Sequence, residues 1–138
     1  MIKTVCKIIG AVFVLAGIAG FVAPGLAGLH LSTAHNLIHL VSGAAALYFG
    51  LAASLSAARM FGIVFGVVYL LLGLAGFLLG SPGTPEMHGM AADSRLFKVI
   101  PGVLELGTSD HLFHVIGGIV FLGAALLTRA DHHGTARD

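Results

Sequence analysis

Two short motifs with the same layout place ionisable side chains at the heads of long apolar runs. The first places His35 and His39 four residues apart, and the second places Asp110 and His114 at the same spacing. Residues four apart lie on one face of an α-helix. An ionisable side chain in an apolar helix is costly and usually marks a functional position. These four residues are therefore the first candidates for a functional site.

The chemistry that suits these residue types is metal binding. Three imidazoles and one carboxylate from two helices can complete a four-ligand Zn²⁺ site, or bind Fe, Mn or Cu together with water. Helical bundles build metal sites from facing side chains in this way. We predict a metal site formed by His35, His39, Asp110 and His114, between the second and fourth helices in the outer leaflet of a membrane.

Three neighbouring polar residues are expected around this site. Asn36 and His111 occupy equivalent positions in the two motifs, and Ser42 follows His39 by about one helical turn. Each can form a hydrogen bond that orients a ligating imidazole. His111 together with His114, spaced three apart, would also give the last helix an alternative ligating face.

A haem is the second hypothesis for the same histidines. Each deeper histidine, His39 or His114, is followed four residues later by a glycine, Gly43 or Gly118. Two axial histidines from two helices, with glycine faces beside a porphyrin, are a workable arrangement for haem b. The chain would then be a haem-binding or accessory subunit of a membrane electron-transfer complex.

A purely structural or interaction role is the third hypothesis. Asp110 is expected in the first turn of its helix, where free amide groups and the helix dipole favour an acid. His39 and His114 can be satisfied by hydrogen bonds between helices, which commonly hold membrane helices together. A histidine near the outer face can also titrate as a proton sensor. The residues alone leave these hypotheses open.

The composition places the motifs in a membrane protein. The apolar fraction is 57%, charged residues make up 9%, and the mean hydropathy is +1.01. No Lys, Arg, Asp or Glu occurs between Lys7 and Arg59, a stretch long enough for two spans of about 20 residues each. We predict a single all-α domain over 1–138, a bundle of four transmembrane helices near 5–23, 33–55, 60–80 and 109–128.

The predicted helices fall into two similar halves. The segment Gly17-Ile-Ala-Gly-Phe21 matches Gly73-Leu-Ala-Gly-Phe77, just as the two histidine motifs match each other. A tandem repeat of a two-helix unit, with halves of about 5–55 and 60–128, explains both matches. Equivalent residues then lie at equal depth and can face one another. The spacing between copies is unequal, which predicts an insertion in the outer loop at about 81–107.

Positive charges predict the orientation of the bundle. Lys3, Lys7, Arg59 and Arg129 flank the N-terminus, the middle loop and the end of the last helix. The positive-inside rule then puts both termini in the cytoplasm and the histidine motifs at the outer face. Within the insertion, residues 96–100 are expected to lie at the membrane interface, over the outer mouth of the bundle.

Other functional classes find little support in the sequence. A net charge of +1 gives no basic field for nucleic acid, and the chain has no phosphate-binding loop or nucleophile motif. We therefore expect a non-enzymatic protein whose partners are the lipid bilayer and, in a homo-oligomer or a membrane complex, other membrane chains. Cys6 is the single cysteine, so no internal disulfide can form.

The histidine motifs also carry a resemblance. The segment 35–40 with Gly43, followed by Asp110 and the segment 114–118, resembles the pattern of a family of small bacterial four-helix integral membrane proteins with paired His motifs, described as a domain of unknown function. The resemblance covers about 8–128 and implies a multi-pass protein of the bacterial inner membrane. It implies no activity. At position 111 this chain has histidine where the pattern has asparagine.

Overall fold

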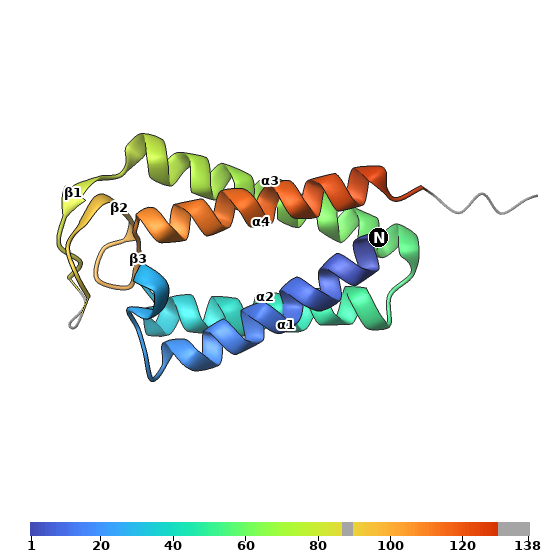
Figure 1. Ribbon diagram of the computed structural model, residues 1–138, viewed down its shortest axis with the longest axis horizontal. Coiled ribbons are helices and arrows are strands. Elements are labelled where there is room, and N and C mark those ends of the chain that lie inside the picture. The colour runs from blue at the N-terminus through green and yellow to red at the C-terminus, as the bar shows by residue number, and fades with distance from the viewer. Residues whose placement is uncertain (87–89, 130–138) are drawn as a thin grey trace, which may run out of the picture.

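The computed structural model describes residues 1–86 and 90–129. The helices are α1 (Ile2–Gly20), α2 (Thr33–Leu51), α3 (Leu55–Leu79) and α4 (Thr108–Leu127), with a short 3₁₀ helix, η1 (Leu26–Gly28), before α2. The strands are β1 (Ser81–Gly83), β2 (Asp93–Ile100) and β3 (Leu104–Leu106). Figure 1 shows two antiparallel hairpins, α1 with α2 and α3 with α4, which lie side by side with the strands at one end.

The distribution of apolar side chains is that of a membrane protein. Three helices, α1, α3 and α4, are long and apolar enough to cross a bilayer. The 19-residue helix α2 is less apolar because His35, Asn36 and His39 lie in its first two turns. Large apolar side chains are nevertheless exposed on all four helices, and on α2 Val41 and Leu51 are 71% and 67% exposed. Buried positions include glycine, alanine and several polar residues.

The start of α3 differs from the prediction because a serine caps this helix early. The hydroxyl of Ser54 accepts a hydrogen bond from the backbone N–H of Ala57, so α3 begins directly after Ser54 and not near 60. Arg59, expected in the middle loop, consequently belongs to α3. Its Nε–H donates to the carbonyl oxygen of Ala125 near the end of α4.

The end of the bundle opposite the strands has an apolar core. Phe121 of α4 is fully buried there, and its ring centroid lies 5.9 Å from that of Phe61 and 5.1 Å from that of Phe65. Ile2 is also fully buried, and its N–H donates to the hydroxyl of Thr128. The N-terminus and the end of α4 therefore lie together at this end, with the α2–α3 turn beside them (Figure 1).

Glycines form the closest contacts within each hairpin. A Cβ atom added to Gly10 of α1 would lie 3.0 Å from the carbonyl oxygen of Gly43 of α2. One added to Gly66 of α3 would also lie 3.0 Å from the carbonyl oxygen of Gly118 of α4. Helix backbones can approach this closely only where the side chain is absent. Both hairpins therefore pack through equivalent glycine contacts.

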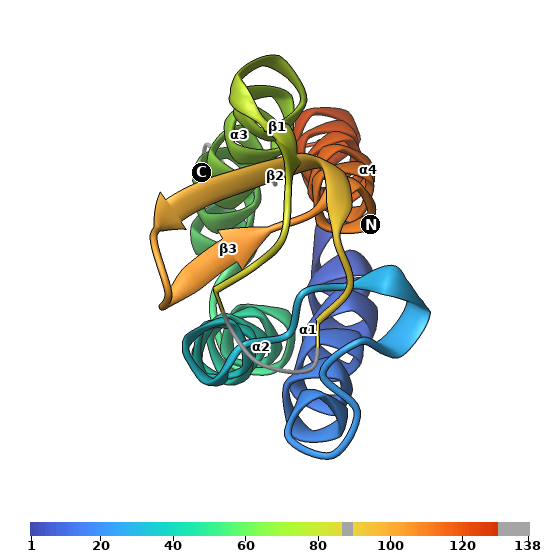
Figure 2. The same ribbon diagram turned by 90° about the vertical axis from the view of Figure 1, so that its left-hand side faces the viewer.

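Residues 81–106 include strands, so the predicted all-α class is wrong for this segment. β1, β2 and β3 form an antiparallel sheet in that order, with Ser81 opposite Leu96 and Phe97 opposite Leu106. The segment 96–100, expected at the membrane interface, belongs to β2. Figure 2 shows the sheet lying across one end of the bundle, and we call the sheet the cap and that end the cap end. Short strands depend on pairing, which the pattern of one segment does not reveal.

A buried carboxylate holds the cap together. Glu105 of β3 accepts hydrogen bonds from the backbone N–H groups of Glu86, at 2.8 Å, and Gly102, at 3.2 Å. The ammonium group of Lys98 lies 3.4 Å from the same carboxylate. Burial raises the pKa of Glu105, but the two N–H donors and Lys98 outweigh it and hold the pKa below its ordinary value.

Candidate functional site

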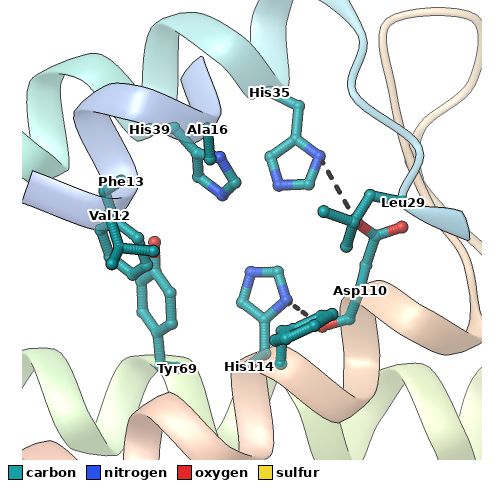
Figure 3. A pocket seen from close by; sticks show the side chains of 10 residues that line it. Val12, Phe13, Ala16, Leu29, His35, His39, Tyr69, Asp110 and His114 are labelled. Atoms are coloured by element: carbon teal, nitrogen blue, oxygen red, sulfur yellow. Dashed lines mark hydrogen bonds and ion pairs between the residues drawn. The ribbon is translucent and has the colours of Figure 1, made fainter. Parts of the chain in front are cut away.

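One cavity near the cap end is lined by all four predicted site residues. His35 and His39 of α2 and Asp110 and His114 of α4 contribute to its wall, and its volume is about 200 Å³. The other lining residues are apolar or aromatic: Val12, Phe13, Ala16, Leu29, Tyr69 and Phe113. Figure 3 shows the three imidazole rings directed toward the same space. We call this cavity the histidine pocket.

Hydrogen bonds determine which nitrogen is protonated in two of these rings. Nδ1 of His35 lies 2.9 Å from the carbonyl oxygen of His30. Nδ1 of His114 lies 2.5 Å from the carbonyl oxygen of Asp110 (Figure 3). A carbonyl oxygen only accepts, so each Nδ1 carries a proton and donates it. In the neutral ring Nε2 then carries a lone pair. Nε2 of His35 is buried and has no hydrogen-bond partner within the described residues.

His39 lies one turn deeper and faces the same space. Its ring centroid is 4.4 Å from that of His35, and its ring stacks on Phe13 of α1 with centroids 5.3 Å apart. Its Nδ1 is also buried without a partner in the described part of the chain. Across the pocket, the ring of His114 lies 6.0 Å from that of His35. Buried ring nitrogens without partners are rare, and they indicate a site that a ligand, an ion or water can satisfy.

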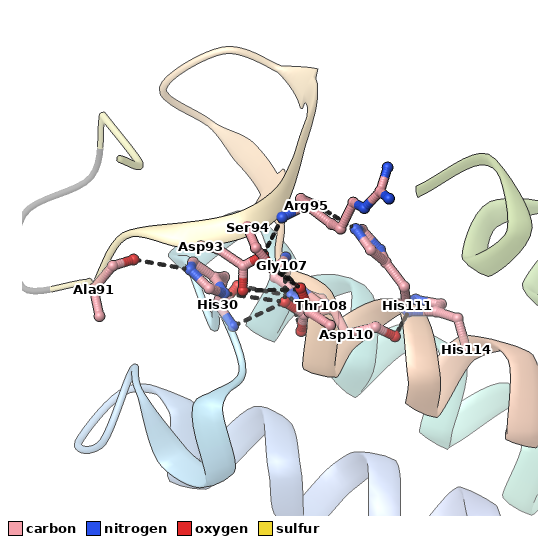
Figure 4. A network of polar contacts seen from close by, with 11 residues as sticks. His30, Ala91, Asp93, Ser94, Arg95, Gly107, Thr108, Asp110, His111 and His114 are labelled. Atoms are coloured by element: carbon pink, nitrogen blue, oxygen red, sulfur yellow. Dashed lines mark hydrogen bonds and ion pairs between the residues drawn. The ribbon is translucent and has the colours of Figure 1, made fainter. Parts of the chain in front are cut away.

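One oxygen of the Asp110 carboxylate, Oδ2, is held by contacts within the protein, whereas Oδ1 is buried without a hydrogen-bond partner in the described residues. Oδ2 accepts hydrogen bonds from the backbone N–H groups of His30, at 3.0 Å, and Gly107, at 2.8 Å (Figure 4). The same oxygen lies 3.3 Å from Nδ1 of His30. An acid in the first turn of a helix binds free N–H groups in this way. This is the role that the structural hypothesis assigned to Asp110.

His30 belongs to this network, although the sequence analysis did not single it out. It is buried in the loop before α2, and its Nε2–H donates to the carbonyl oxygen of Ala91 at 3.3 Å. The contact with the Asp110 carboxylate raises the pKa of His30, against the opposing effect of burial. His30 lies outside the helices, so helical spacing could not predict it. The one feature of the sequence that could have indicated His30 as a site residue is that it lies five residues before His35.

Tyr69 of α3 also lines the pocket, although its sequence context indicated only packing. Its ring centroid lies 4.8 Å from that of His114 and 5.4 Å from that of Phe13. The tyrosine stands in an uninterrupted apolar run, where helix packing is the ordinary role of an aromatic residue. Its place at the pocket depends on how α3 lies against α4, which the run itself does not reveal.

The three residues expected around the site do not line the pocket. Asn36 packs against Gly20 of α1, and His111 packs against Gly76 of α3. The Nε2–H of His111 donates to the carbonyl oxygen of Arg95 in the cap at 2.7 Å, so this ring is directed away from the pocket and does not share a face with His114 (Figure 4). Ser42 is only half-buried.

The glycines of the haem hypothesis contact neighbouring helices. A Cβ atom on Gly43 would lie 2.8 Å from the carbonyl oxygen of Gly10, and one on Gly118 would lie 2.6 Å from the backbone nitrogen of Leu70. These glycines therefore serve helix packing. A cavity of about 150 Å³ holds one benzene molecule, so the histidine pocket, at about 200 Å³, encloses one small ring, and a porphyrin bound there would have to extend out of the pocket.

A metal ion would require a small movement of the rings. Among residues 1–86 and 90–129, no three His, Cys, Asp or Glu side chains are placed to hold an ion as they stand. The centroids of the His35 and His114 rings are 6.0 Å apart. With Zn–N bonds of about 2.0 Å and tetrahedral angles, rings that share an ion have centroids about 5 Å apart. The two rings would have to approach by about 1 Å.

No protein-family model matches this chain, and no curated protein or solved structure matches it. The resemblance of its histidine motifs to a family of small bacterial membrane proteins stays a prediction. The function is therefore inferred from the bundle and the histidine pocket.

Proposed function

We propose that this chain is a multi-pass protein of the bacterial inner membrane in which all four helices span the bilayer. The proposal adds α2 to the three helices that are long and apolar enough to span. Its 19 residues measure about 29 Å, close to the hydrocarbon thickness of about 30 Å. Its histidines line the pocket, its asparagine packs against α1, and its exposed side chains include Leu37, Ile38 and Val41. Polar groups that face the bundle interior are compatible with a spanning helix.

We also propose that the two hairpins are copies of one ancestral hairpin, oriented with both termini in the cytoplasm. The matched glycine contacts of Gly10 and Gly66 support the duplication. Lys3 and Arg59 support the orientation, since both side chains lie at the end opposite the cap, where they donate to backbone carbonyl groups. The cap and the histidine pocket then lie on the outer side.

Cysteine labelling tests this topology. Gly25→Cys, Ala52→Cys and Ser94→Cys each introduce a thiol at an exposed position, in a Cys6→Ser background. A membrane-impermeant maleimide added to intact cells should label positions 25 and 94 and leave position 52 unlabelled. Labelling of positions 25 and 52 from the same side would contradict a spanning α2. Labelling of position 52 alone would contradict the orientation.

Within this membrane protein, we propose that the histidine pocket binds a transition metal ion through His35, His39 and His114. The supporting observation is that Nδ1–H of His35 and Nδ1–H of His114 each donate to a backbone carbonyl oxygen. Metal-binding histidines are commonly held this way, because the hydrogen bond orients the ring and leaves the other nitrogen as the ligand. An ion would also satisfy Nε2 of His35 and Nδ1 of His39, which are buried and have no partner in the described residues.

Asp110 positions the ligands in this proposal and does not bind the ion. Its carboxylate lies 3.9 Å from Nδ1 of His35, whereas the lone pair of that ring is on Nε2. The carboxylate of Asp110 accepts from the backbone N–H of His30, and the carbonyl oxygen of His30 in turn accepts from Nδ1–H of His35. The backbone carbonyl oxygen of Asp110 accepts from Nδ1–H of His114. Three imidazoles with one open position for water suit Zn²⁺ or Cu²⁺. No reaction is assigned to the ion, and the proposed role is non-enzymatic.

Metal content in a matched pair of variants tests the proposal. His114→Asn removes a ligand, while His111→Asn makes the same change at a buried position on the same helix that does not line the pocket. Purified protein saturated with Zn²⁺ and then washed should retain about one ion per chain, and His111→Asn should retain the same amount. His114→Asn should retain about one ion less. Equal retention by the two variants would contradict the proposal, and the comparison cancels binding by histidines elsewhere in the chain.

A further inference from the structure

The histidine pocket is open on a side of the bundle that faces lipid. Its lining includes Val12 of α1 and Phe113 of α4, and each of these side chains is 54% exposed. Both residues belong to the apolar outer surface of helices that are able to cross a membrane. Ala16 of α1, one turn from Val12, lines the same opening and is half-buried. A molecule dissolved in the bilayer can therefore reach the pocket between α1 and α4.

The size and walls of the pocket suit one aromatic ring. The ring of Phe13 lies between those of His39 and Tyr69, at centroid distances of 5.3 and 5.4 Å and interplanar angles of 5° and 22°. These stacked rings give the pocket an aromatic wall, against which another ring can pack edge to face or with an offset. The volume of about 200 Å³ slightly exceeds that of a cavity that holds benzene, about 150 Å³. One six-membered ring with a small polar substituent fits this space.

The polar end of the pocket presents hydrogen-bond acceptors. Because Nδ1–H of His35 and Nδ1–H of His114 donate to carbonyl oxygens, the Nε2 atom of each neutral ring can only accept. A ligand that bonds to either of these two atoms must therefore supply a donor, and a hydroxyl group is the simplest one. An ether oxygen or a ketone oxygen at the same place would face a lone pair and leave Nε2 unsatisfied.

We infer that the histidine pocket binds the ring of a lipid-soluble phenol. The phenol enters between α1 and α4, its ring packs beside Phe13 and Phe113, and its hydroxyl group donates to Nε2 of His35 or His114. An alkyl tail stays in the bilayer beside Val12. This inference goes beyond the proposed metal site and does not need the ion. Since both ligands use the same lone pairs, Zn²⁺ and the phenol should compete.

A phenol and its methyl ether test the donor requirement. The purified full chain in detergent, with EDTA present, is titrated with 4-hexylphenol or 4-hexylanisole, and binding is followed calorimetrically and by the ¹⁵N chemical shifts of the histidine rings. The phenol should bind saturably and shift a pocket Nε2 resonance. The ether, which lacks one hydrogen bond, should bind about tenfold more weakly. Equal affinity for the two compounds, or no saturable binding of the phenol, would overturn the inference.

A pair of tryptophan variants tests the entry route. Val12→Trp places a large side chain at the opening, while Leu15→Trp makes the same kind of change at an exposed position on α1 that does not line the pocket. Val12→Trp should lose most phenol binding and Leu15→Trp should keep it. Unchanged phenol binding in Val12→Trp would overturn the inference. Both variants keep the histidines, so their Zn²⁺ retention reports on the metal proposal separately.

Discussion

Replacement of Gly118 by alanine tests the close contact between α3 and α4. A Cβ atom at this position would lie 2.6 Å from the backbone nitrogen of Leu70 and 2.8 Å from the carbonyl oxygen of Gly66. Both are backbone atoms of α3, so no side chain can move aside and the two helices must separate. Overpacking of this kind costs about 1–3 kcal/mol. Alanine recovers about 0.5–1 kcal/mol of helix stability relative to glycine.

The net expectation is a loss of about 1 kcal/mol, and of at most about 2.5 kcal/mol, in the free energy of unfolding for Gly118→Ala. Gly123→Ala on the same helix is the matched control, because a Cβ atom there would meet no heavy atom within 4 Å. This control should gain about 0.5–1 kcal/mol. Gly43→Ala should resemble Gly118→Ala, since its Cβ atom would lie 2.8 Å from the carbonyl oxygen of Gly10.

The assay is reversible unfolding in mixed micelles, followed by circular dichroism as the fraction of denaturing detergent rises. The order of midpoints should be Gly123→Ala, wild type and then Gly118→Ala, from most to least stable. If Gly118→Ala and Gly123→Ala unfold at the same midpoint, backbone contact does not limit the approach of α3 and α4. Equal midpoints would also favour the haem hypothesis, in which Gly118 borders an open cleft and does not contact α3.

Two further predictions concern buried carboxylates. Asp110→Ala should lower the free energy of unfolding by about 3–5 kcal/mol, because it leaves the His30 and Gly107 N–H groups and the His30 ring without their partner; wild-type stability in the same unfolding assay would refute this role. Glu105→Gln should destabilise the cap at pH 7, measured by amide hydrogen exchange in 93–106. The folded pKa of Glu105 is lowered, so its contribution is complete above the ordinary glutamate pKa of about 4.3 and is lost as pH falls through the folded pKa. The difference in cap stability between Glu105→Gln and wild type should therefore become smaller in acid. A difference that becomes larger in acid would contradict a lowered pKa for Glu105.

Local patterns were sufficient to predict the helices and the shared faces of the histidine motifs. A spacing of four places His35 with His39 and Asp110 with His114, and each pair lines the pocket. The long apolar runs correspond to α1, α3 and α4, which are able to cross a membrane. The strands of the cap were not predicted, because β2 is ordered by pairing with segments before and after it in the chain.

The amino-acid sequence by itself determined that ionisable side chains stand on single helical faces at the heads of apolar helices, because helical periodicity is local. Only the tertiary structure decided what those faces meet, because the rotation of a helix about its axis depends on what it packs against. Asn36 and His111 follow His35 and Asp110 directly in sequence, yet each packs against a glycine of the neighbouring helix. His35 and Asp110 are equivalent in sequence, and the folded loop before α2 contacts both of them in different ways: the N–H of His30 donates to the carboxylate of Asp110, whereas the carbonyl oxygen of His30 accepts from Nδ1–H of His35.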